Sequence, residues 1–127
     1  MIYTSYFAKV RALENESIVP ISIALFKPKW YHGLEYKKLA PTESILREYK
    51  YLTDAEHYEK RFEAEILKSL NAHRVIQELI QLAGDNQKFA LLCYETPLSF
   101  CHRFVVTKWL IKYGYECQEF VDTKRSE

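Results

Sequence analysis

The residues best suited to chemistry lie in one short segment, residues 93–103 (CYETPLSFCHR). It leads from an apolar run, typical of a buried strand, into a predicted helix. Cys93 and Glu95 are two positions apart, so their side chains point to the same side of an extended chain. Cys101, His102 and Arg103 fall in the first turns of the helix, where the helix dipole lowers the pKa of a thiol. The segment predicts a polar site at the carboxyl edge of a sheet, where α/β domains bind ligands.

Each of these side chains also has a structural alternative. Cys101 is a nucleophile of lowered pKa, a metal- or ligand-binding residue, or a small packing residue on the apolar stripe of its helix. His102 is a general base or a core histidine bonded to a strand carbonyl. Arg103 holds an anion bidentately, or it forms a salt bridge with Glu95 that pins the strand to the helix. We take Cys101, His102 and Glu95 as candidate catalytic residues and Arg103 as a candidate ligand-binding residue.

The same segment does not favour a metal centre. Cys93, Glu95, Cys101 and His102 lack the paired spacings typical of zinc ligands, and adjacent cysteine and histidine rarely bind one ion. The chain has only 3 glycines, and they form neither type of glycine-rich phosphate loop. We therefore expect no metal and no cofactor. Any bound anion would be held by side chains and by the start of a helix.

Composition describes one domain spanning residues 1–127. The chain has 127 residues, a formal net charge of +1 and a hydrophobic fraction of 48%, enough for a real core. The near-zero net charge does not support general binding to nucleic acid, although it leaves room for a local basic patch. Three cysteines without paired spacing argue against a disulfide framework. The longest apolar stretch, residues 18–26, is too short to cross a bilayer, so we expect a cytoplasmic protein without a membrane partner.

Apolar patterning predicts the elements that position this segment. Residues 2–8, 18–26 and 88–94 read as strands, and residues 115–121 alternate as a shorter one. Helices are expected after Thr42, after a capping box of Thr53 with Glu56, before Gly84 and before Gly114. This order predicts an α/β fold, a three-layer domain with a small, mostly parallel sheet of about four strands flanked by helices.

Residues 27–42 form the longest irregular segment, and they interleave aromatic with basic side chains. Trp30, Tyr31, Tyr36 and Lys38 are candidate ligand-binding residues, because such surfaces stack bases and contact phosphates. The alternative is a loop pinned by buried aromatic rings, with its lysines in water. Arg11, near the end of the first strand, is predicted to lie on the same sheet edge if the strands are parallel.

The sequence resembles the family called domain of unknown function 488, in its short single-domain form. The resemblance rests on the segments TSYFAKV, IVPISIAL, WYHGLEYKKLAP and LLCYETPLSFCHRFVVTKWL, with the C-Y-E…C-H-R signature and the K-L-A-P loop as its specific motifs. It implies a compact α/β domain found in bacteria and their phages, and it implies no established activity. Through the resemblance Lys50 joins the candidate ligand-binding residues, although residues 47–50 stand in a region that varies between members.

These observations predict a small protein with one polar site that binds or acts on a small anionic, nucleotide-like or nucleic-acid ligand. In this reading Arg103 binds the anion, His102 transfers a proton or donates a hydrogen bond, and Glu95 orients one of them. The alternative is a non-catalytic module that binds protein or nucleic acid, in which the segment 93–103 only supports the fold. The sequence predicts no particular oligomeric state.

Overall fold

The computed structural model describes residues 1–94 and 102–122. Within these residues, five strands form one sheet in the order β3-β2-β4-β1-β5, and every pairing is parallel. The strands are β1 (Ile2–Tyr6), β2 (Ile18–Ser22), β3 (Leu34–Glu35), β4 (Lys88–Cys93) and β5 (Cys117–Glu119). The predicted parallel α/β architecture is confirmed. The strand beyond the four predicted is β3, a short edge strand inside the segment that the sequence indicated as a loop.

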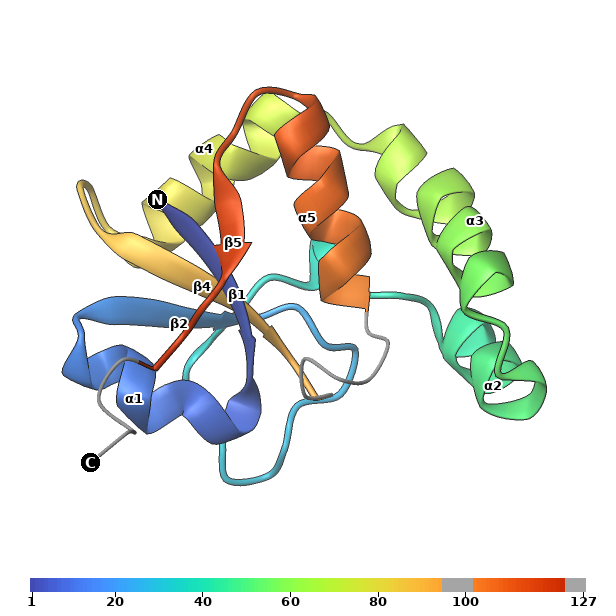
Figure 1. Ribbon diagram of the computed structural model, residues 1–127, viewed down its shortest axis with the longest axis horizontal. Coiled ribbons are helices and arrows are strands. Elements are labelled where there is room, and N and C mark those ends of the chain that lie inside the picture. Colours follow the sequence, from blue (N-terminus) through green and yellow to red (C-terminus); the bar gives the residue numbers. More distant parts are fainter. Residues whose placement is uncertain (95–101, 123–127) are drawn as a thin grey trace.

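Helices cover both faces of the sheet, as the layer prediction requires (Figure 1). One face carries α1 (Val10–Asn15), whose Leu13 packs with Ile18 and Leu92 in one apolar cluster. The other face carries α4 (Ala72–Ala83) and α5 (His102–Lys112), and α2 (Glu43–Leu52) and α3 (Ala55–Glu65) extend beside α5. Short 3-10 turns span Phe7–Lys9, Lys37–Leu39 and Leu67–Ser69. None of the helices in the described residues combines the length and apolar character that a bilayer crossing needs.

The helix ends follow local sequence signals in most places. The Thr42 side chain accepts a hydrogen bond of 3.1 Å from the backbone N–H of Ile45, which caps α2 as predicted. Gly84 follows α4 with φ of 102°, a conformation that glycine adopts without strain. The predicted capping box at Thr53 is wrong: Thr53 has φ of 52° and ends α2, and the side chain of Asp54 caps α3 instead. A threonine beside an aspartate competes with it for the same cap.

The strand order places a crevice beside the segment of interest. After β2 the chain leads to β3 at one edge of the sheet, and after β4 it passes through α5 to β5 at the opposite edge. The strands β2 and β4 are paired neighbours. The chain therefore leaves two adjacent carboxyl ends toward opposite edges of the sheet. In parallel α/β sheets such a switch point leaves a crevice in which ligands bind.

Candidate functional site

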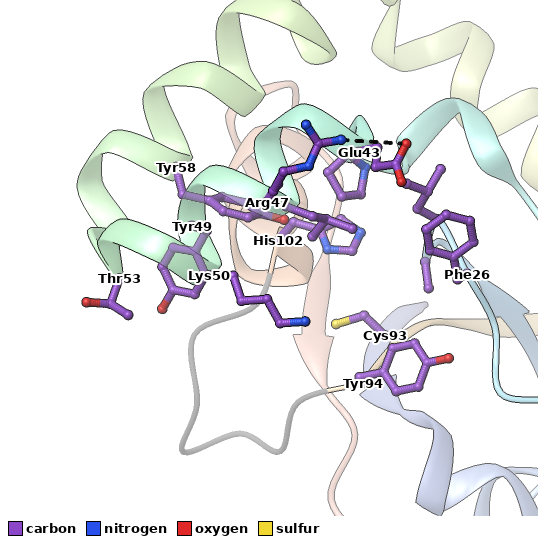
Figure 2. A pocket seen from close by; sticks show the side chains of 14 residues that line it. Phe26, Glu43, Arg47, Tyr49, Lys50, Thr53, Tyr58, Cys93, Tyr94 and His102 are labelled. Carbon is purple, nitrogen blue, oxygen red and sulfur yellow. Dashed lines mark ion pairs between the residues drawn. The ribbon is translucent and has the colours of Figure 1, made fainter.

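A pocket of about 800 Å³ opens at this switch point (Figure 2). One wall comes from the residues that follow β2, a second from α2, and the floor from the end of β4 and the start of α5. Apolar and aromatic groups predominate, with a few charged groups at the rim. The lining includes Ala24, Leu25, Phe26, Pro41, Glu43, Leu46, Arg47, Tyr49, Lys50, Thr53, Tyr58, Cys93, Tyr94 and His102.

His102 lies at the floor of the pocket as a buried, neutral side chain. Its Nε2 lies 2.8 Å from the carbonyl oxygen of Ile23, and its ring packs at 5.4 Å from that of Phe62. Burial lowers the pKa of His102 to about 4, so the imidazole is uncharged near neutral pH. Because a carbonyl only accepts, Nε2 carries the proton and donates it. The structural alternative predicted for His102 was a hydrogen bond to a carbonyl, and this bond is present. The same side chain also lines the pocket.

Arg103 is buried and bonded within the fold. Its Nε and second terminal nitrogen donate to the two carboxylate oxygens of Glu119 at 3.1 and 3.2 Å, and Nη1 lies 3.1 Å from the sulfur of Cys93. Thr4 donates to the same carboxylate at 2.7 Å, which ties β1 into the network. The guanidinium also stands 5.7 Å from the Tyr6 ring. This bidentate pair holds α5 against β5, and Arg103 does not line the pocket.

The remaining chemical side chains of segment 93–103 are Cys93, Glu95 and Cys101. Glu95 and Cys101 lie outside the described residues. Cys93 is disulfide-bonded, so it presents no thiolate in this structure, and the sequence did not predict that bond. Among the described residues no group of three histidine, cysteine or carboxylate side chains is placed to hold a metal ion.

The aromatic and basic segment 27–42 has two of its tyrosine side chains anchored by hydrogen bonds. The Tyr31 hydroxyl donates to the carbonyl of Leu34 at 2.7 Å, and burial raises the pKa of Tyr31 to about 12. The hydroxyl of Tyr36, also buried, donates to Glu78, and Lys38 pairs with the same carboxylate at 3.1 Å. These contacts correspond to the structural alternative for the loop. Neither tyrosine nor Lys38 lines the pocket.

Of the three remaining candidates, Lys50 lines the pocket and Trp30 and Arg11 do not. Trp30 is 59% exposed and stands on the α1 side of the sheet, with its ring 6.5 Å from that of Phe7. Arg11 is an exposed residue of α1, and it does not line the pocket. Lys50, which the family resemblance brought in, does line the pocket and extends its ammonium group toward Cys93 (Figure 2). Of the candidates in the described residues, His102 and Lys50 are therefore the two that share the pocket.

Sequence reasoning missed the second basic residue of the pocket. Arg47 precedes Lys50 by three positions on α2, and residues so spaced are neighbours on a helix face. Arg47 has a side chain 73% exposed and a long contact of 3.8 Å with Glu43. An exposed ion pair of this kind is worth little, so the guanidinium can turn to a ligand at small cost. The spacing of Arg47 and Lys50 was the signal available in the sequence.

Fold and pocket together define a class: a three-layer α/β domain with a parallel sheet and a pocket at its topological switch point. The family model described as "Active DUF488-N3 subclade" (DUF488-N3a) matches residues 14–114. The chain therefore belongs to the DUF488 family, and the family predicted from its motifs is confirmed. Comparison with curated proteins gives no match, and comparison with solved structures gives none.

Proposed function

We propose that the pocket binds a small anionic, nucleotide-like ligand. The observation that carries the proposal is the pairing of an apolar, aromatic cavity with two exposed cations, Arg47 and Lys50, at one side of it. Ligand pockets commonly have this composition, in which apolar walls bury most of the ligand and a few polar groups orient it. A planar base fits the aromatic part, and a phosphate group fits the cations.

The electrostatics of the pocket support an anion on α2 rather than at Arg103. Arg103 already uses its bidentate face on Glu119, whereas Arg47 and Lys50 reach water. His102 adds no positive charge near neutral pH, because burial lowers its pKa. Its role in the proposal is to supply a fixed, neutral ring to the floor.

Titration calorimetry with nucleoside monophosphates tests the proposal. We expect binding to the wild-type protein and about tenfold weaker binding by Lys50→Ala and by Arg47→Ala, since each change removes a charge-assisted contact. Lys60→Ala is the matched control: Lys60 is an exposed lysine of α3 that does not line the pocket, so this variant should bind as the wild type does. The proposal is wrong if no nucleotide binds, or if Lys50→Ala and Lys60→Ala have the same affinity.

The second candidate function is a non-catalytic interaction module. The full engagement of Arg103 with Glu119 and Cys93 favours it, because the most prominent cation of the motif then serves the fold. Under this alternative, nucleotides do not bind the pocket, and Arg103→Ala loses stability without changing any affinity for a partner. The same calorimetric series therefore separates the two candidates.

A further inference from the structure

Two large exposed aromatic side chains contact the buried ring of Phe7, and one of them, Tyr94, also lines the pocket. Trp30 is 59% exposed and Tyr94 is 48% exposed, and both rings stand on the buried ring of Phe7. The centroid of Phe7 lies 6.5 Å from that of Trp30 and 5.0 Å from that of Tyr94. We call Trp30 and Tyr94 the aromatic platform. Because exposed rings are rarely grouped without a use, the platform is a candidate contact surface.

The platform stands on a rigid base. Phe7 is 3% exposed and packs against Tyr31 at 5.2 Å, and Tyr31 is fixed by its hydrogen bond to Leu34. Trp30 meets the same Tyr31 ring edge-on at 6.5 Å. Rings held in place before binding lose little conformational freedom when a ligand stacks on them. The hydrogen bonds that take Tyr31 out of the predicted ligand surface therefore support Trp30.

The aromatic platform and the pocket are continuous. Tyr94 belongs to both, since it lines the pocket and stands on Phe7. Phe26, which is 61% exposed, lines the pocket from the segment after β2 (Figure 2). A ligand seated between Phe26 and Tyr94 thus lies next to the ring that shares its base, Phe7, with Trp30. A free mononucleotide is too short to use both areas, because it offers one base.

The segment that carries Trp30 contains more basic than acidic residues. Residues 26–38 contain four lysines and one carboxylate, with Lys29 exposed directly before Trp30. Glu35 contacts Lys27 at 3.5 Å and Lys37 at 3.8 Å, and Glu78 pairs with Lys38 at 3.1 Å, whereas Lys29 takes part in none of these ion pairs. Such an alternation of rings and cations is complementary to a chain of bases and phosphates. The net charge of the whole chain conceals this local excess.

We propose that the ligand is a nucleotide within a single-stranded nucleic acid, with one base in the pocket and a neighbouring base stacked on the aromatic platform. This inference rests on the proposed function and names its substrate class. A single strand is required because the faces of bases inside a duplex are covered by their neighbours. Arg47 and Lys50 hold the phosphate of the nucleotide in the pocket, and Lys29 lies beside the path of the next one.

Fluorescence anisotropy with a labelled oligothymidylate of about ten nucleotides tests the inference, since this length covers a typical single-strand site. We expect the oligonucleotide to bind more tightly than thymidine monophosphate. Trp30→Ala should weaken oligonucleotide binding about tenfold, the usual effect of losing one stacking ring, and leave monophosphate binding unchanged. Tyr113→Ala is the matched control, because Tyr113 is 46% exposed and lies just beyond the end of α5, away from the pocket lining.

A second readout separates stacking from charge. In Trp109→Phe protein, Trp30 is the remaining tryptophan, so quenching of its fluorescence by the oligonucleotide reports stacking directly. The inference is overturned if the oligonucleotide binds no tighter than the monophosphate, if a duplex or a polyglutamate peptide competes equally well, or if Trp30→Ala has no effect. In those cases monophosphate binding that depends on Lys50 still supports the proposed function. Absence of monophosphate binding overturns both proposals.

Discussion

Arg103 and Arg47 place the same guanidinium group in two contrasting regions of one small domain. Arg103 is fully buried between α5 and β5, with both carboxylate oxygens of Glu119 and the sulfur of Cys93 around it. Arg47 stands on α2 with a side chain 73% exposed and one long contact to Glu43. The first region holds elements of the fold together, and the second offers charge to whatever enters the pocket.

The difference shows where binding capacity can reside in such a domain. A buried arginine needs a carboxylate partner, because an uncompensated buried charge is strongly unfavourable. Once Glu119 meets that need, Arg103 has little left for a ligand. Arg47 and Lys50 lie outside the two specific motifs of the sequence, yet both are exposed and line the pocket. The prominence of a residue in the sequence and its availability to a ligand are thus separate properties.

The largest expected effect compares the two arginines directly. Arg103→Met should lower the free energy of unfolding by roughly 3 to 4 kcal/mol, because it removes the cation paired with the Glu119 carboxylate, which keeps only its hydrogen bond from Thr4 among the contacts described above. Arg47→Met should change it by less than about 0.5 kcal/mol, as exposed ion pairs contribute little. Urea unfolding followed by circular dichroism measures both. Equal losses in the two variants would remove the distinction between the regions.

The next effect concerns His102, which lies between the two regions. Its pKa in the folded state is about 4, below its ordinary value near 6.5, so the unfolded chain binds more protons between these values. The contribution of neutral His102 to the free energy of unfolding is fully present above pH 6.5. It should decline as the pH falls from 6.5 to about 4, by up to about 3 kcal/mol in total. Unfolding curves across this range measure it. His102→Gln should show a flatter profile, and parallel profiles in the two proteins would contradict the assignment to His102.

A smaller effect is expected in the segment 27–42, where Tyr36, like Arg103, is buried and bonded to a carboxylate of the fold. Tyr36→Phe removes the hydrogen bond to Glu78 and should lower the free energy of unfolding by about 1 kcal/mol. The hydrogen bond from Tyr36 is also the main reason why the pKa of Glu78 lies below its ordinary value. The pKa of Glu78 should rise in the variant, which an NMR titration detects. An unchanged Glu78 pKa would show that this contact does not act on the carboxylate.

The smallest effect on stability is expected at the pocket rim. Lys50→Ala should shift the free energy of unfolding by less than about 0.5 kcal/mol, because the side chain is exposed. The same variant should lose about tenfold in affinity for nucleoside monophosphate, the reverse of the pattern expected for Arg103→Met. Thermal unfolding and calorimetry on one preparation compare the two quantities. A large loss of stability would place Lys50 with the residues that hold the fold.

Local signals in the sequence predicted much of the fold. The apolar run of β4 reads as a strand covered on both faces, and its residues from Phe89 to Cys93 are indeed buried. Thr42 begins α2 and Gly84 ends α4 through contacts within a few residues, so these helix boundaries too were visible in the sequence. The two-residue strand β3 was not, since so short a pairing depends on β2 lying beside it.

The candidate site was predictable only in part, because much of it depends on contacts between segments far apart in the sequence. Glu119 was not recognised as the partner of Arg103, because the strand order that brings β5 beside β1 is not encoded in any local pattern. The pocket depends on α2 folding back over the carboxyl ends of β2 and β4, which also escapes a pass along the chain. His102 was identified with both of its open roles, because its position at a helix start is a local property.

The position of β1 in the sheet has a consequence for the order of assembly. Ile2 pairs with Phe89 on one side and with Cys117 on the other, so both neighbours of the first strand are made late in synthesis. A nascent chain can bring β2 and β3 together early, yet β1 must wait for most of the polypeptide to leave the ribosome. Long-range parallel pairing of this kind slows folding. While β1 waits for these partners, its unpaired edges are open to aggregation.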